Sequence, residues 1–131
     1  MDSETFARFK YCQLVTFRRN GTRMPTPVWF AVRDGRLLVK TETPSGKVKR
    51  IRNDARVEVA PCTLRGGLRG PFVAGHARML PAAEESAAEA VLRRRYGVGR
   101  KIFSLVVEPF FHLRGQRSVY LEIAPSAEVA R

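Results

Sequence analysis

The stretch from Tyr11 to Thr41 decides how the chain folds, and it reads YCQLVTFRRNGTRMPTPVWFAVRDGRLLVKT. It contains two dipeptides, Asn20-Gly21 and Asp34-Gly35, that tolerate the positive φ angles of a tight hairpin turn. Runs rich in β-branched and aromatic residues flank each dipeptide, which is typical of paired antiparallel strands. The stretch therefore predicts a meander of three strands, at residues 11–18, 23–32 and 36–41.

Two prolines interrupt the second of these strands. Pro25 and Pro27 have no backbone N–H, so each removes a donor from the hydrogen-bonded ladder. A sheet tolerates a proline where no neighbouring strand needs that donor. We therefore expect this part of the strand to lie at an edge, at a bulge, or where another group approaches its backbone.

The remaining sequence predicts both helices and further strands. Val48, Ile51 and Ala55 form a narrow apolar stripe, which predicts a short helix that begins near Ser45. The further predicted elements are strands at 56–61, 72–80 and 118–124, a helix at 81–96 that ends at Gly97, and a shorter amphipathic segment at 100–112. Five or six antiparallel strands with these helices predict one domain spanning residues 1–131, mainly β with α additions, whose strands close into a small barrel.

The net charge of the chain is strongly positive. It has 24 Lys and Arg residues against 12 Asp and Glu residues, a formal net charge of +12 in 131 residues. A surplus of this size attracts anions and speeds their encounter with the protein, but it has no bearing on the fold. We therefore expect an anionic partner, which could be a nucleic acid, a phosphorylated small molecule, a polycarboxylate or an acidic membrane surface.

Several classes of protein are not indicated. There is no apolar run of about 18 residues and the N-terminal segment MDSETFARFK is polar, so we expect no membrane span, no secretory signal and a cytoplasmic location. The two cysteines, Cys12 and Cys62, and the two histidines, His76 and His112, are too few and too scattered for a zinc site. We expect no metal and two buried thiols.

The segment from Thr41 to Arg56 gives the clearest indication of a ligand. Its cations cluster at and just after the predicted helix start, where unpaired N–H groups and the helix dipole favour an anion. Ser45 can cap the helix and donate its hydroxyl to a phosphate oxygen, while Gly46 lets a ligand approach the backbone. The cations are Lys47, Lys49, Arg50, Arg52 and Arg56. This pattern predicts a phosphate site, and it leaves a solvated basic helix open as the alternative.

Familiar phosphate-binding and catalytic motifs are missing. The spacing around Gly46-Lys47 does not fit a P-loop, and the glycine-rich segment at 66–70 does not fit the GxGxxG pattern of a dinucleotide site. No serine stands in a GxSxG motif, and His76 has no acidic partner in a recognisable motif. If the protein is an enzyme, a bound cofactor should supply the reactivity and the chain should hold it in position.

A second basic cluster, at residues 93–101, contains five cations and no acid. Its first three arginines fall at the end of the predicted helix, where the dipole favours cations without any ligand. A nucleic-acid-binding module is an alternative, because small barrels with basic loops also bind oligonucleotides. However, the aromatic residues gather in apolar runs such as Trp29-Phe30, and no strand interleaves them with basic residues. Nucleic acid is therefore the less favoured partner.

In an ordered set of motifs, the chain resembles the split β-barrel flavin and deazaflavin proteins related to pyridoxamine 5′-phosphate oxidase. The motifs are N-G-T, P-T-P-V-W-F, D-G-R-L, S-G-K-V-K-R-I-R-N and V-x-V-A-P-C. They are most similar to the branch of oxidoreductases that depend on coenzyme F-420, an 8-hydroxy-5-deazaflavin. The resemblance covers residues 11–80 well, and residues 92–97 and the final strand more loosely. It implies a six-stranded antiparallel split β-barrel that forms a homodimer and binds its cofactor in a groove between the subunits.

The resemblance also implies which residues hold the cofactor. The phosphate would lie near the start of the short helix, and the ring would lie along the strands, where the two prolines leave backbone groups free to face it. The implied residues are Ser45, Gly46, Lys47, Lys49 and Arg50 for the phosphate, Pro27, Val28, Trp29, Thr41 and Thr43 for the ring, and Pro61 and Cys62 as weaker backbone candidates.

Charge favours coenzyme F-420 over flavin mononucleotide (FMN). The deazaflavin carries a phosphate and a γ-glutamyl tail with several carboxylates, which suits a net charge of +12, and residues 65–69 or 93–101 could receive that tail. The implied activity is hydride transfer between the deazaflavin and an unsaturated small molecule, with no catalytic side chain indicated. An FMN-binding protein of the same fold and a cofactor carrier without turnover are the alternatives.

Overall fold

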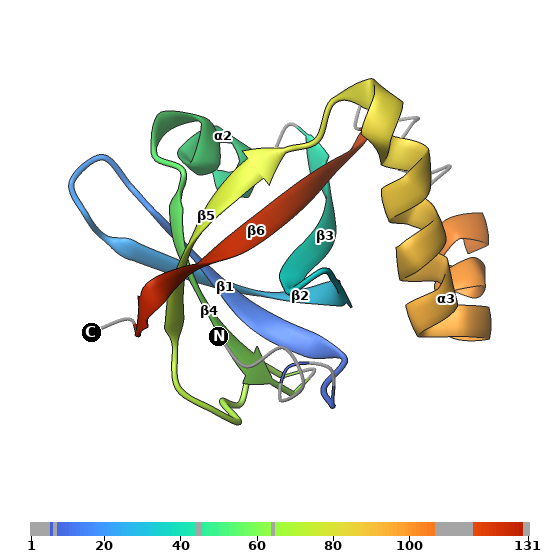
Figure 1. Cartoon of the computed structure of the whole chain (residues 1–131), viewed down its shortest axis with the longest axis horizontal. Coiled ribbons are helices and arrows are strands. Elements are labelled where there is room, and N and C mark those ends of the chain that lie inside the picture. The colour runs from blue at the N-terminus through green and yellow to red at the C-terminus, as the bar shows by residue number, and fades with distance from the viewer. Residues whose placement is uncertain (1–5, 7, 44–45, 64, 107–116, 130–131) are drawn as a thin grey trace.

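Six antiparallel strands close into a barrel in the order β1-β2-β3-β6-β5-β4 (Figure 1). The computed structural model describes residues 6, 8–43, 46–63, 65–106 and 117–129. The strands are β1 (Tyr11–Phe17), β2 (Arg23–Arg33), β3 (Arg36–Thr43), β4 (Arg56–Cys62), β5 (Val73–Met79) and β6 (Arg117–Val129), and the helices are α2 (Gly46–Asn53) and α3 (Ala82–Val106). The prediction of a mainly β fold, with a six-stranded antiparallel barrel and α additions, is confirmed.

Two tight turns set the register of the first three strands. Asp34 and Gly35 have φ angles of 53° and 74°, the positive values that a two-residue turn between β2 and β3 requires. In the turn between β1 and β2, Gly21 has a φ of 87°, and the Asn20 side chain accepts a hydrogen bond from the Thr22 N–H at 3.0 Å. Both predicted hairpins are therefore present.

The strands β2 and β3 pair over only part of their lengths. Their ladder joins Phe30–Arg33 to Arg36–Val39. On its other side β2 pairs with β1 as far back as Arg23, and β3 pairs with β6 as far as Thr43. The two strands therefore part beyond this short ladder, which leaves a break in the hydrogen-bonded wall between them.

Pro25 and Pro27 lie in the part of β2 that borders this break. The Arg18 N–H donates to the Thr22 carbonyl at 3.0 Å, and the same register pairs Pro27 with Gln13. Because bonded and non-bonded pairs alternate along an antiparallel ladder, both prolines fall on non-bonded pairs. Their nitrogens and carbonyls thus face away from β1, and their missing N–H groups cost no bond with it. Of the three predicted possibilities, an edge, a bulge or an approach by another group, the pairing pattern shows an edge.

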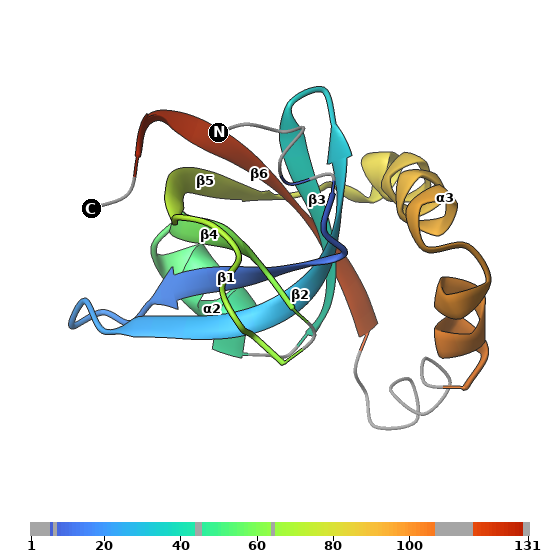
Figure 2. The ribbon, with the colours of Figure 1, turned by 90° about the horizontal axis from the view of Figure 1, so that it is seen from below.

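The core fills the barrel interior, and the two helices cover different parts of it. The largest interior side chain is Phe30, which is fully buried and meets the Phe6 ring edge to face at 6.0 Å between centroids. Helix α2 packs against β1 and β3 and inserts Ile51 into the same core. Helix α3 lies outside the wall (Figure 2), where Ala88 and Leu92 pack in a second apolar cluster. Helix α2 therefore contributes to the core inside the barrel, whereas α3 does not.

The helix α3 is longer than predicted. It runs from Ala82 to Val106 and continues through Gly97, which the sequence suggests as its end. Glycine disfavours a helix interior by about 1 kcal/mol but does not forbid it. The segment predicted separately at 100–112 therefore belongs to α3 as far as Val106, and its residues 107–112 lie outside the described residues. Neither α2 nor α3 is long and apolar enough to cross a membrane.

A buried carboxylate joins three strands on the outside of the barrel. Glu122 on β6 is 8% exposed and accepts hydrogen bonds from Arg36 at 3.0 Å and from Arg78 at 3.1 Å. Arg33 adds a third cation at 3.6 Å. Burial alone raises the pKa of the Glu122 carboxyl, but the hydrogen bonds and charges of Arg78 and Arg36 outweigh it, so this pKa lies below its ordinary value. The carboxylate therefore fastens β2, β3 and β5 to β6.

We expect Phe30→Ala to lower the free energy of unfolding by about 3–5 kcal/mol, because it removes a fully buried ring and leaves a cavity. Chemical denaturation measures the change. Arg8→Ala is the control, since Arg8 is exposed and its truncation should change stability by about 0.5 kcal/mol or less. Equal losses in the two variants would contradict this account of the core.

We expect Glu122→Gln to lower the free energy of unfolding at pH 7 by about 1–3 kcal/mol, because three arginines lose a charged acceptor. A carboxyl whose pKa is depressed on folding stabilises the fold above its unfolded pKa and stops doing so as the pH falls through the folded pKa. The wild type should therefore lose more stability than the variant as the pH falls below about 4.5. Denaturant midpoints from pH 7 to pH 3 test this, and parallel curves would contradict it.

Candidate functional site

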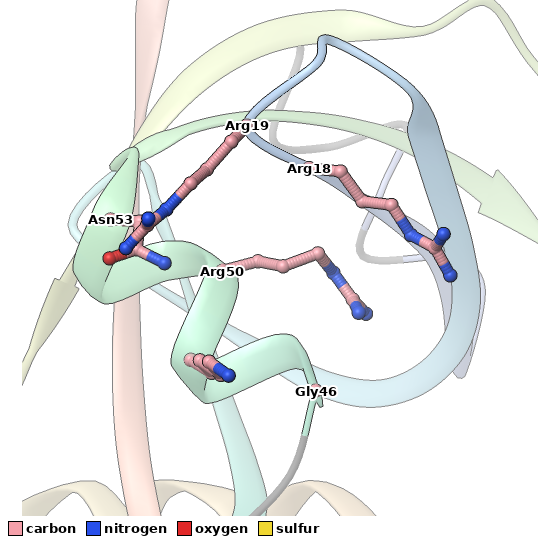
Figure 3. A pocket seen from close by; sticks show the side chains of 6 residues that line it. Arg18, Arg19, Gly46, Arg50 and Asn53 are labelled. Carbon is pink, nitrogen blue, oxygen red and sulfur yellow. The ribbon is translucent and has the colours of Figure 1, made fainter.

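A cavity of about 430 Å³ lies where the β1–β2 hairpin meets the start of α2 (Figure 3). Its lining comes from two segments that are far apart in the sequence, and we call it the cationic pocket. The lining residues are Arg18, Arg19, Gly46, Lys49, Arg50 and Asn53. Because α2 begins shortly after β3 ends, the pocket lies between the hairpin and the end of β3, at the open end of the break between β2 and β3.

Arg50 is held in this pocket from two directions. Its Nε donates to the Thr16 hydroxyl at 2.6 Å, and Thr16 is fully buried on β1. Its guanidinium lies across the first residue of α2, so that a Cβ placed on Gly46 would come within 2.7 Å of Nη1. A glycine at this position therefore leaves room for the guanidinium.

The four cations of the cationic pocket have no carboxylate to neutralise them. Among the described residues, no Asp or Glu oxygen lies within 4.0 Å of the charged groups of Arg18, Arg19, Lys49 or Arg50. Burial first, and then the charge of Arg18, lower the pKa of the Arg50 guanidinium below its ordinary value. Like charges held together in this way favour the binding of an anion.

The structure brings together part of the predicted phosphate site. Of the residues predicted to bind phosphate, Gly46, Lys49 and Arg50 line the cationic pocket. Lys47 is half-buried and does not line it. Ser45 lies outside the described residues, and so does the side chain of Thr43.

The residues predicted for the ring form a second group, around the start of β1. Trp29 and Cys62 both pair with Tyr11, from opposite sides of β1, and the rings of Trp29 and Tyr11 lie 6.3 Å apart. Pro27 is exposed at the strand edge. The side chains of the other four residues are buried, namely those of Val28, Thr41, Pro61 and Cys62. Only their backbone groups could meet a ligand without a rearrangement.

The two groups are separated along β1. Thr16 contacts the cationic pocket through Arg50, whereas Tyr11 marks the level of Trp29 and Cys62. Thr16 lies five residue steps along the strand from Tyr11, which is roughly 17 Å. The edge of β2 that carries Pro25 and Pro27 spans this interval. An elongated ligand with one anionic end could therefore contact both groups, whereas a compact one could not.

Acceptors outnumber donors beside this edge. The carbonyls of Pro25 and Pro27 face away from β1 without accompanying N–H groups. Next to Pro27, the Nε2 of Gln13 donates to the Gly66 carbonyl at 3.1 Å, while its buried Oε1 has no partner among the described residues. The edge therefore suits a ligand that donates hydrogen bonds.

Sequence reasoning missed Arg18, Arg19 and Asn53. The signal that could have found the two arginines is the run Arg18-Arg19-Asn20-Gly21, which places adjacent cations at the mouth of a predicted hairpin. Only the packing of α2 against β1 shows that this hairpin lies beside the helix start.

Both cysteines agree with the sequence analysis. Burial is the main cause that raises the pKa of both thiols, and the neighbouring Cys62 adds to it at Cys12. Both cysteines are free and buried, as predicted. Within the described part of the chain, no cluster of His, Cys, Asp and Glu could hold a metal ion.

Comparison with known proteins gives a family and a set of similar folds. A sequence model of the pyridoxamine 5′-phosphate oxidase family matches residues 3–120. A heme storage protein of Vibrio cholerae aligns with a TM-score of 0.71 and 12% identity over 97% of this chain and 89% of its own. An F-420 reductase aligns at 0.63 and 18%, over 97% and 95%. A FAD-binding protein of Mesorhizobium loti aligns at 0.66 and 16%, over 95% and 88%.

At these identities, the three structures show a shared fold and nothing further. No curated protein matches the chain.

We expect inorganic phosphate to raise the melting temperature of the protein, because an anion that binds only the folded state stabilises it. Arg18→Gln and Arg50→Gln should each reduce the shift by about half or more, since each removes one of four cations in the pocket. Scanning fluorimetry at constant ionic strength, with chloride as the reference anion, measures it. Arg8→Gln, the same charge change at an exposed residue, is the control. A similar reduction in that control would contradict a localised site.

Proposed function

Because the chain belongs to the pyridoxamine 5′-phosphate oxidase family, we propose that it is an oxidoreductase that binds a phosphorylated flavin-type cofactor, and that this cofactor is coenzyme F-420. The observation that carries the proposal is the cationic pocket, which is lined by four side-chain cations without a described carboxylate. Structural cations are usually paired, so unpaired cations in a concave site indicate an anionic ligand.

The residues present fit the phosphate of such a cofactor. Lys49 lies in the first turn of α2, and the side chain of Arg50, from the last turn, reaches back over Gly46, where the helix dipole also favours an anion. Arg18 and Arg19 line the same pocket from the hairpin, and the side chain of Arg19 extends towards Asn53 (Figure 3). Arginine can donate two parallel hydrogen bonds to phosphate oxygens, and lysine supplies a point charge. Ser45 and Lys47, which the family resemblance implies as phosphate ligands, remain proposals.

The edge of β2 fits the rest of an elongated cofactor. This edge runs from the hairpin beside the pocket towards Trp29, and it exposes the carbonyls of Pro25 and Pro27. A ring system with an N–H donor can bind to such carbonyls. In the described structure these carbonyls face the break and not a paired strand, so a ligand could bind to them without breaking any strand pairing.

The choice of coenzyme F-420 over FMN depends on charge. Both ligands have a phosphate, but only the deazaflavin adds a tail of carboxylates. Beyond the pocket, the chain exposes Arg65 and Arg69 after β4, and neither has an ion pair within the described part of the chain. In the other candidate region, Arg93 already pairs with Glu89, so that arginine is the poorer receptor for a tail.

We further propose a homodimer with the cofactor between its subunits. One subunit supplies the pocket and a single exposed strand edge, which would leave one face of a planar ring in water. Leu68, which is 49% exposed, lies in the loop that packs beside Gln13 and Pro27 through Gly66, and it offers an apolar contact near this edge. Sedimentation that shows a monomer in the cofactor complex would contradict the dimer.

When bound, a deazaflavin supplies two-electron hydride chemistry towards an unsaturated small molecule. The chain's part is to bind the phosphate, orient the ring along β2 and keep water from it. The polar side chain that lies beside Pro27 near Gly66, Gln13, is an amide and does not transfer protons as an acid or base. Any catalytic group is therefore left unassigned.

Titration with coenzyme F-420, followed by its fluorescence, tests the proposal. Lys49→Ala should weaken binding by about tenfold or more, because it removes a charge-assisted contact with the phosphate. Lys47→Ala should weaken it less, since Lys47 does not line the pocket.

Each other outcome of this titration has a meaning. The reverse order of the two variants would move the phosphate to Lys47. Tighter binding of FMN than of coenzyme F-420 would favour the flavin alternative. No fluorescence change at micromolar cofactor would overturn the proposal.

A further inference from the structure

Thr16 is a buried hydroxyl whose bond leads directly to the cationic pocket. It lies on β1 with no exposed surface, while its neighbours on the same face of the strand, Leu14 and Cys12, belong to the apolar core. Its Oγ1 accepts the hydrogen bond from Arg50 Nε at 2.6 Å. An apolar side chain of the same size would fill this position without needing a partner, so the hydroxyl calls for an explanation.

The place that Arg50 occupies is electrostatically unfavourable for a cation. Side chains on a helix lean towards its N-terminus, and Arg50 thereby lies over Gly46, one turn back, at the positive end of the α2 dipole. Arg18 adds like charge from the hairpin, and no described carboxylate balances either residue. A long side chain with many rotamers would reduce this repulsion by turning out to water.

Two contacts oppose that movement. Arg50 Nε is tied to Thr16, so that its stem crosses from α2 to β1, and its guanidinium fits against a residue without a Cβ. The bond uses only Nε, and this leaves the two terminal nitrogens, Nη1 and Nη2, available to donate in parallel to one anion.

We propose that Thr16 is a positioning residue for the anion site: through Nε, and with the space left by Gly46, it holds the Arg50 guanidinium in the cationic pocket before any ligand arrives. This inference rests on the proposed function, in which the pocket binds phosphate. Positioning lowers the entropy cost of binding, because the guanidinium is already ordered where its charge is needed.

The test uses inorganic pyrophosphate and isothermal titration calorimetry on the full chain. Thr16→Val removes the hydroxyl with little change in volume and should weaken pyrophosphate binding by about three- to tenfold, the ratio expected for one hydrogen bond. Thr16→Ser keeps the hydroxyl and should restore most of the affinity. Arg50→Gln should weaken binding at least as much as Thr16→Val.

A double-mutant cycle separates positioning from a merely structural role. If Thr16 acts through Arg50, Thr16→Val should have no further effect on affinity in the Arg50→Gln background. A loss of equal size in both backgrounds would overturn the inference, because Thr16 would then act through the general stability of β1. Melting temperatures without ligand, measured for every variant, show whether each one folds.

Gly46→Ala provides a second route if Thr16→Val does not fold. A methyl group at this position would lie 2.7 Å from Nη1 and would displace the guanidinium, while alanine favours the helix. Binding should weaken about threefold or more, again only where Arg50 is present. If Arg50→Gln itself leaves pyrophosphate affinity unchanged, the proposed function of the pocket fails. If Arg50→Gln weakens binding but neither Thr16→Val nor Gly46→Ala does, only the positioning inference fails.

Discussion

The lack of a backbone N–H at Pro25 and Pro27 is the constraint on which the barrel wall and its candidate site both depend. Where a strand lacks backbone N–H groups on one side, a neighbouring strand on that side loses hydrogen bonds and is held there less strongly. Accordingly β3 leaves β2 after Val39 and continues along β6 to Thr43. The chain then turns into α2, which packs back on β1 and closes the end of the barrel with Ile51. The cationic pocket arises from this route, because it brings the start of α2 next to the hairpin.

The acids of the chain are distributed in a way that leaves this region positive. Glu122 and Glu89 neutralise cations on the outer wall near α3, and Glu58 pairs with Arg23 across β1. The acid that follows α2 directly, Asp54, is engaged by Arg56, whose side-chain hydrogen bond is the first cause of its lowered pKa. A net charge of +12 is therefore not spread evenly, and its unpaired part includes the residues that a ligand could reach.

Local chemistry explains why so much of the fold could be predicted. The two hairpins depend on Asn20-Gly21 and Asp34-Gly35, whose backbone preferences act without the rest of the protein. The prediction that the helix ends at Gly97 was wrong because the preference of glycine against a helix interior is only about 1 kcal/mol and does not by itself end a helix. The site was predicted in part for a similar reason: Lys49 and Arg50 belong to one helix start, whereas Arg18 joins them only through tertiary packing, which no local pattern encodes.

A pocket built from mutually repelling groups must be stabilised by the rest of the protein. The cost is small as long as the cations stay near water, because solvent and salt screen charges at the surface. Arg18, Arg19 and Lys49 meet this condition, since all three are exposed. Arg50 is the exception: it is half-buried, and its polar partner among the described residues, Thr16, is neutral. The fold thus offsets the cost of a single desolvated cation with one buried hydroxyl and one glycine, while the other three cations keep their freedom to adapt to an anion. Arg50 is therefore the cation of the pocket that is held in place, and the other three can move.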